Sequence, residues 1–161
     1  MGNNYTTPIG LGLQSEYCQG QEINPEYAAN ITKTFKIGRN GVGGMNFNFA
    51  APADLLQQNI DMGFILPAYC KIIIAVITCT IALVGIADMN MILGSASAGN
   101  QYIQSGSVNA LNEFINNGAT PDRLPAATKV WLGATPVTNT WDLATAGEWL
   151  VTITYKDYSK L

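Results

Sequence analysis

The chain has 161 residues, a length typical of one domain, and 48% of them are apolar, enough to build a core without disulfide or metal links. Only 12% are charged, against roughly 25% in an average soluble domain, and the formal net charge of −3 argues against nucleic acid as a partner. The sequence has no histidine, which excludes the usual general base, the Ser-His and Cys-His pairs and the commonest metal ligand.

Residues 1–30 show no sustained hydrophobic period and are rich in Gly, Asn, Gln, Pro and Tyr. A merely disordered tail would carry more charge and fewer apolar side chains. The pattern predicts an extended N-terminal arm that precedes a folded domain over residues 31–161. An alternative is that the arm packs back on its own domain as an edge strand. We expect the arm to bind a neighbouring protein surface, either an adjacent subunit or the larger assembly, through Tyr5, Ile9, Leu11, Leu13 and Tyr17.

A period of two begins after the arm and predicts strands. Ile31, Phe35 and Ile37 share one face of the first strand. Residues 38–44 form a glycine-rich stretch, which we interpret as a hairpin turn because it lacks the Gly-Lys-Ser/Thr of a phosphate loop. Residues 45–49 then alternate Met, Phe and Phe with Asn, as in a half-buried strand.

Residues 54–65 are expected to form another strand, and the strongly apolar run 72–87 follows a turn at Pro67. As a helix this run would span about 24 Å, short of the ~30 Å hydrocarbon core of a bilayer. Its β-branched residues instead favour a buried strand, a turn and the start of another strand. We therefore expect no membrane segment here.

The next strand is expected to place Ala87, Met89, Met91 and Leu93 on one face. One short helix is then predicted over residues 107–117. Ser107 is a suitable cap for it, and Asn-Asn-Gly at 116–118 is a suitable stop. The apolar positions at helical spacing are Val108, Leu111, Phe114 and Ile115.

The C-terminal part has the clearest strand pattern. Val130 and Leu132 alternate with Lys129 and Trp131 in one strand. The last strand places Trp149, Val151, Ile153 and Tyr155 on one face, with Thr152, Thr154 and Lys156 on the other. Many short strands with frequent turns predict an all-β, antiparallel β-sandwich that is jelly-roll-like, with one short helix. The expected core includes Ile73, Ile77, Met89, Met91, Val151 and Ile153.

Three cysteines, Cys18, Cys70 and Cys79, are odd in number and form no C-x-x-C spacing. Two of them lie within apolar stretches, where a free cysteine usually behaves as a small hydrophobe. The pattern favours folding in a reducing, intracellular environment.

Asp142 and Glu148 are the best candidates for an enzyme, because a glycosidase needs only two carboxylates and Trp141 and Trp149 could stack on a sugar. The favoured interpretation is different: Trp149 belongs to the core, Trp141 covers a loop, and both acids are solvated. We therefore expect no catalytic, cofactor-binding or metal-binding residue, and no cofactor.

The layout from about residue 64 to 158 resembles a known family. Leu66-Pro67-Ala68 leads into an Ile/Val strand, residues 87–94 give a strand that ends in glycine, and a polar excursion follows over 95–127. Trp131-Leu132 and the terminal run 146–155 complete the pattern. Together they resemble the small decoration (cement, or auxiliary capsid) proteins of tailed-bacteriophage heads.

This resemblance implies a jelly-roll-like subunit of the virion that binds the outer face of the shell between capsid subunits and reinforces it. The implied partner is the major capsid protein, with assembly in the host cytoplasm and no nucleic acid or membrane contact. Because capsid lattices present threefold positions, we expect a homotrimer. The alternative is a receptor-binding or carbohydrate-binding β-sandwich module of a phage tail or head fibre.

Overall fold

The computed structural model of the chain describes residues 29–38, 45–49, 57–117, 123–138 and 140–159. Eight β-strands make up most of this part. Their bounds are Asn30–Gly38 (β1), Gln58–Leu66 (β2), Cys70–Val84 (β3), Met89–Gly94 (β4), Ile103–Ser107 (β5), Phe114–Asn117 (β6), Thr128–Pro136 (β7) and Ala146–Asp157 (β8).

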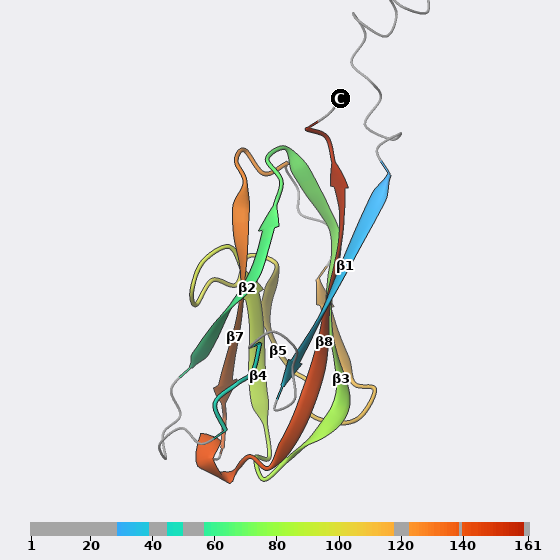
Figure 1. The fold of residues 1–161 in the computed structure, drawn as a ribbon. Coiled ribbons are helices and arrows are strands. Elements are labelled where there is room, and N and C mark those ends of the chain that lie inside the picture. The colour runs from blue at the N-terminus through green and yellow to red at the C-terminus, as the bar shows by residue number, and fades with distance from the viewer. Residues whose placement is uncertain (1–28, 39–44, 50–56, 118–122, 139, 160–161) are drawn as a thin grey trace, which may run out of the picture.

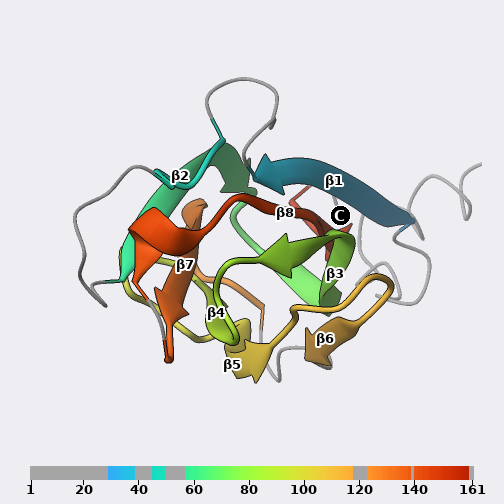
Figure 2. The same ribbon diagram turned by 90° about the horizontal axis from the view of Figure 1, so that it is seen from below.

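The strands form two four-stranded antiparallel sheets, ordered β1-β8-β3-β6 and β2-β7-β4-β5. The sheets lie face to face, as Figures 1 and 2 show. Within them β1 pairs with β8, β2 with β7, β3 with β6 and β4 with β5. The strands therefore form a long antiparallel hairpin, in which β1–β4 are one half and β5–β8 are the other half. This hairpin is wrapped into a sandwich. This is the jelly roll, and the predicted β-sandwich is confirmed.

β8, which has a period-two pattern, is one of the two inner strands of the first sheet. Trp149, Val151, Ile153 and Tyr155 are buried, while the threonines between them are partly exposed. β8 pairs with β1 on one side and with β3 on the other, so its buried row lies in the middle of the core. This face was predicted correctly because simple alternation continues from Trp149 to Tyr155.

β3 is longer than expected, since residues 70–84 form one strand and the turn comes at Gly85, which has a φ of 93°. A shift in the register against β8 occurs between Ile72 and Ile74. Before it the even-numbered residues are buried, and after it the odd-numbered ones are. Ile77 is therefore in the core as predicted, but Ile73 is only half-buried and Ile72 occupies the core position instead.

The helix predicted over residues 107–117 is wrong. Residues 103–107 and 114–117 are strands, and the loop between them is fixed by hydrogen bonds to β3. Asn112 has a φ of 65°, and its N–H donates to the carbonyl of Cys79 at 2.9 Å. Pairing with β3 thus outweighs the short helical pattern. In the described residues, helical structure is limited to a 3₁₀ turn at Trp141–Leu143.

Residues 45–49 have the predicted alternation without forming a strand of either sheet. Phe47 and Phe49 are buried, and the asparagines beside them are exposed. Asn48 is held by the side chain of Gln58, which accepts from its N–H at 2.6 Å and donates to its carbonyl at 2.9 Å. The buried face of β4 is slightly shorter than predicted. Met89, Met91 and Leu93 are buried, but Ala87 is exposed.

None of the helical residues that the structure describes forms a segment long and apolar enough to cross a bilayer. Most of the apolar run 72–87 lies in the strand β3, which spans Cys70–Val84. Its partners are β8 and β6, and its inward side chains belong to the core.

Candidate interaction surface

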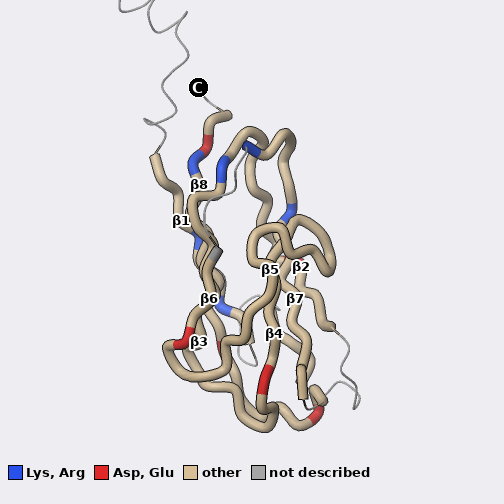
Figure 3. The backbone as a smooth tube through the Cα atoms, turned by 180° about the vertical axis from the view of Figure 1, so that it is seen from behind, with Lys and Arg blue, Asp and Glu red and all other residues tan. Residues whose placement is uncertain are grey.

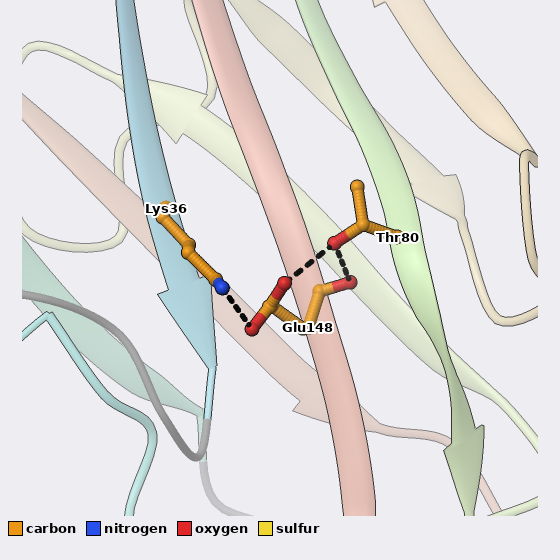
Figure 4. A network of polar contacts seen from close by, with 3 residues as sticks. All are labelled: Lys36, Thr80 and Glu148. Carbon is orange, nitrogen blue, oxygen red and sulfur yellow. Dashed lines mark hydrogen bonds and ion pairs between the residues drawn. The ribbon is translucent and has the colours of Figure 1, made fainter.

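The two carboxylates considered for catalysis lie in different surroundings. Asp142 is exposed in the 3₁₀ turn, whereas Glu148 at the start of β8 is only 6% exposed. The expectation that both acids are solvated is therefore wrong for Glu148. Its carboxylate forms an ion pair with Lys36 of β1 at 2.8 Å and accepts a hydrogen bond from Thr80 of β3 at 3.0 Å (Figure 4).

This ion pair has a structural role in the first sheet. Lys36, Glu148 and Thr80 come from three adjacent strands, so their contacts connect β1, β8 and β3 on the outer face (Figure 4). The Thr80 hydroxyl also lies 3.3 Å from the Glu148 carbonyl. A carboxylate engaged in this way is satisfied by the protein itself.

Both tryptophans beside these acids are fully buried. The ring of Trp141 lies 5.4 Å from that of Phe47, and the indole N–H of Trp149 donates to the carbonyl of Val108 at 2.7 Å. Trp149 was placed correctly in the core, whereas Trp141 belongs to the core rather than covering a loop. Neither indole has an exposed face for a sugar.

One side of the sandwich, where the edge strands β1 and β2 lie, is closed by aromatic packing and carries charge. The rings of Phe35 on β1 and Phe64 on β2 lie 5.3 Å apart. Lys33 and Lys36 project from β1, and Asp61 of β2 forms an ion pair with Lys129 at 2.7 Å. Charged side chains on an edge strand prevent a foreign strand from pairing there.

The other side, formed by β5 and β6, carries no charged residue on either strand. The two edges touch where Ile115 packs over Gly106: a Cβ added to Gly106 would lie 2.5 Å from Cγ2 of Ile115. Next to this contact is a groove of about 270 Å³. It is lined by Ile103, Gln104, Ser105, Ile115 and Asn116.

Two exposed apolar side chains flank this uncharged edge. Leu111, in the loop before β6, is 59% exposed, and Phe114 at the start of β6 is 58% exposed. Phe114 lies directly opposite Thr78 of β3 and so shares the outer face of the first sheet. We call β5, β6, this groove and these two side chains the β5–β6 edge.

A polar cluster holds the loop that leads into β6. The carboxylate of Asp88 accepts hydrogen bonds from the Ser107 hydroxyl and from the Asn109 side chain, and these lower its pKa. Glu113 accepts from the N–H groups of Asn109 and Ala110, at 2.7 and 2.9 Å, which lowers the pKa of its carboxyl group as well. The loop therefore supports the β5–β6 edge from one end.

Two neighbouring rows on the outer face of the first sheet consist of uncharged side chains. Thr32 of β1 and Thr154 of β8 are hydrogen-bonded at 3.0 Å, and Thr34 and Thr152 lie at 3.3 Å in the next row. Val76 of β3 continues the second row. Threonine pairs of this kind stabilise a sheet without giving its surface a charge.

Charges are unevenly distributed along the sandwich. Figure 3 shows most Lys and Arg residues toward the end where the C terminus lies and most Asp and Glu residues toward the other end. At the first end Arg123 stacks on Tyr158, with 4.1 Å between its Cζ and the ring centroid. Tyr69 is also there, in the turn before β3, with a φ of 60° and a side chain that is 56% exposed.

The residues predicted to make interface contacts, Tyr5, Ile9, Leu11, Leu13 and Tyr17, lie outside the described residues. The β5–β6 edge was missed because the sequence pattern favoured a helix there. One signal could have identified it: no charged residue occurs between Met89 and Asn112. Among the described residues there is no group of three or more His, Cys, Asp or Glu that could hold a metal ion.

Comparisons of the chain with protein-family models, with curated proteins and with solved structures found no match.

Proposed function

We propose that this chain is a structural protein of a bacteriophage particle, which binds the outer face of the shell between subunits of the major capsid protein and stabilises it. The proposal rests first on the resemblance of residues 64–158 to decoration proteins. The jelly roll supports it, since viral capsid domains use this fold, as do lectins and cupins. Because one fold serves many functions, the choice between them has to be argued from the features of the surface.

The observation that carries the proposal is the uncharged β5–β6 edge of the sandwich. A small domain that is free in solution usually has a surface of roughly 25–35% charged residues. Here the β5–β6 edge has no charge on its strands, and the outer face of the neighbouring sheet presents threonine pairs. Such a surface suits permanent contact with neighbouring proteins, as in a virion.

Cryo-electron microscopy of particles released from cells that produce the chain tests this function. We expect jelly-roll density at regular positions over the outside of the shell, and none of it inside. Particles without the chain should lose integrity at a lower temperature. Purified particles that contain no copies of the chain would overturn the proposal.

We further propose that the chain assembles as a homotrimer, with the N-terminal arm reaching an adjacent subunit or the capsid surface. A trimer matches the threefold positions of a capsid lattice. The oligomeric state can be measured by sedimentation velocity over a hundredfold range of concentration and by the density on the particle. Monomers in both would contradict it.

A receptor-binding or carbohydrate-binding module of a tail or head fibre is the second candidate, and one observation favours it. Tyr69 has a left-handed backbone conformation that is costly for a residue with a side chain, and such strain is concentrated at functional sites. Its exposed ring could stack on a sugar. Binding to a glycan array that is lost in Tyr69→Ala, with copies only at the fibre tip, would favour this candidate over decoration.

A further inference from the structure

We infer that the β5–β6 edge receives residues 9–13 of a second copy as an added strand, an inference that rests on the proposed side-by-side assembly of copies. In this arrangement each arm extends the partner's sheet at β6, and its apolar side chains enter the groove beside β5. Main-chain hydrogen bonds then supply affinity, and alternate side chains supply specificity.

The receiving edge has the chemistry that an added strand needs. Among the described strands of its sheet β6 is the outermost, so one side of its backbone faces away from β3. The groove combines the apolar side chains of Ile103 and Ile115 with the polar ones of Gln104, Ser105 and Asn116. Apolar groups can thus be buried while amide and hydroxyl groups satisfy a peptide backbone.

The opposite side of the sandwich lacks these properties. β1 carries Lys33 and Lys36, and the space between β1 and β2 contains the packed rings of Phe35 and Phe64. A neutral apolar strand would have to desolvate a lysine in order to pair there. Of the two sides, the β5–β6 edge is therefore the one that accepts such a strand.

Residues 9–13, Ile-Gly-Leu-Gly-Leu, match this edge in shape and charge. In an extended conformation Ile9, Leu11 and Leu13 all project to one face, and the intervening glycines leave the other face bare. Five extended residues span about 17 Å, comparable to the ~13 Å of a four-residue strand. No charged side chain occurs in residues 1–15, so this segment suits an uncharged groove.

Exchange of arm segments between copies would produce a closed oligomer. Each copy has one donor segment and one receiving edge, so the contact is heterologous and generates a ring when the rotation closes. Every closed ring satisfies all donors and all edges, and the proposed trimer is one such ring. Residues 14–28 can span up to about 50 Å when extended, long enough to reach a neighbour.

Cysteine cross-linking of the full-length chain tests the inference. In a Cys18→Ser background, Leu11→Cys is placed in one tagged copy, and Asn116→Cys or Gln104→Cys in a second copy with a different tag. Mild oxidation should link the two tags through a mixed disulfide, because an arm strand that pairs with β6 and faces the groove beside β5 brings the Cα atoms within about 7 Å. Thr32→Cys on β1 is the control, since it is an exposed polar position on the opposite edge strand of the same sheet.

We expect at least about tenfold more mixed disulfide with Asn116→Cys or Gln104→Cys than with Thr32→Cys, which corresponds to ~1.4 kcal/mol of preference. Equal yields would mean random collision and would overturn the inference. So would a link within one chain when Leu11→Cys and Asn116→Cys are combined, since the arm would then bind its own edge.

A second measurement avoids engineered thiols. Leu11→Asp should convert the oligomer to monomers in sedimentation experiments, because a carboxylate would be buried in the groove, whereas Gln14→Asp adds the same charge outside it. An oligomer that survives Leu11→Asp contradicts the inference. If both measurements fail while copies are still found on the shell, the proposed function stands and only the docking of the arm is rejected.

Discussion

Lys36 and Glu148 are unequal partners in the ion pair on the outer face of the first sheet. The carboxylate is 7% exposed and the lysine side chain 44% exposed, so only the lysine can recover its hydration when the pair is broken. The cost of a variant therefore depends on which partner is removed.

Lys36→Met should lower the free energy of unfolding by about 1–3 kcal/mol, because it leaves a nearly buried carboxylate with only Thr80 as a partner. Glu148→Gln should cost less, since the amide still accepts from Thr80 and the free lysine is hydrated. Urea unfolding of both variants and of the double variant measures this order. Equal losses in the two single variants would contradict the unequal roles of the two partners.

The thiols of Cys70 and Cys79 are fully buried in the core. Burial raises the pKa of Cys70 to about 11 and raises that of Cys79 as well. This agrees with the interpretation of both residues as small hydrophobes.

In a Cys18→Ser variant neither thiol should react with a thiol-specific reagent at pH 8 until the chain unfolds, because the thiolate is the reactive species. The reaction rate should therefore follow the unfolding rate measured by tryptophan fluorescence. Rapid labelling of the native protein would show that β3 opens locally.

At the scale of elements, the register shift in β3 decides which isoleucine contributes to the core. Ile72 is 1% exposed, and Ile73 is half-buried on the other side of the strand. Ile72→Ala should lower the free energy of unfolding by about 2–5 kcal/mol, and Ile73→Ala by clearly less. Chemical denaturation of this matched pair tests the register, and a larger loss for Ile73→Ala would contradict it.

The hydrogen bonds of Asp88 in the loop region between β5 and β6 should make the stability of the fold depend on pH in the acidic range. The pKa of Asp88 is lowered chiefly by the hydrogen bond from Ser107 and also by that from Asn109. A lowered pKa in the folded state stabilises the fold above the ordinary aspartate pKa of about 3.9, and this stabilisation is lost as the pH falls through the lowered value.

Asp88→Asn should therefore lower the melting temperature at pH 7, and the difference from the unchanged chain should shrink below about pH 4. Thermal melts across this range measure the effect. Asp142→Asn is the matched control, because Asp142 is an exposed carboxylate at the same end of the sandwich. A difference that stays constant with pH would mean that the ionised form of Asp88 does not stabilise the loop.

At the scale of the whole molecule, the described part of the chain forms both sheets from eight strands, the first of which begins at Asn30. Deletion of residues 1–28 should therefore leave the melting transition nearly unchanged, while it weakens self-association and retention on particles. Calorimetry and sedimentation of the truncated chain test this together. If the truncated chain fails to fold, the arm is part of the sandwich and both the arm and its docking site must be reconsidered.

Much of the fold follows from local alternation in the sequence. The buried faces of β4, β7 and β8 were predicted because Met91, Leu132 and Val151 occur in regular period-two patterns. The sparse charge and the absence of histidine likewise needed no structure. These features belong to single strands or to composition, so the sequence alone determines them.

Only the tertiary structure decided the remaining features, because they depend on pairing between distant segments. The shift at Ile72–Ile74 arises from the fit of β3 to β8, about 80 residues further along the chain. Residues 107–117 had a helical pattern, yet contacts with Cys79 and Asp88 hold them as a loop and a strand. The β5–β6 edge exists because two short strands from opposite sheets meet, and a local pattern does not record which strands are outermost in a sandwich.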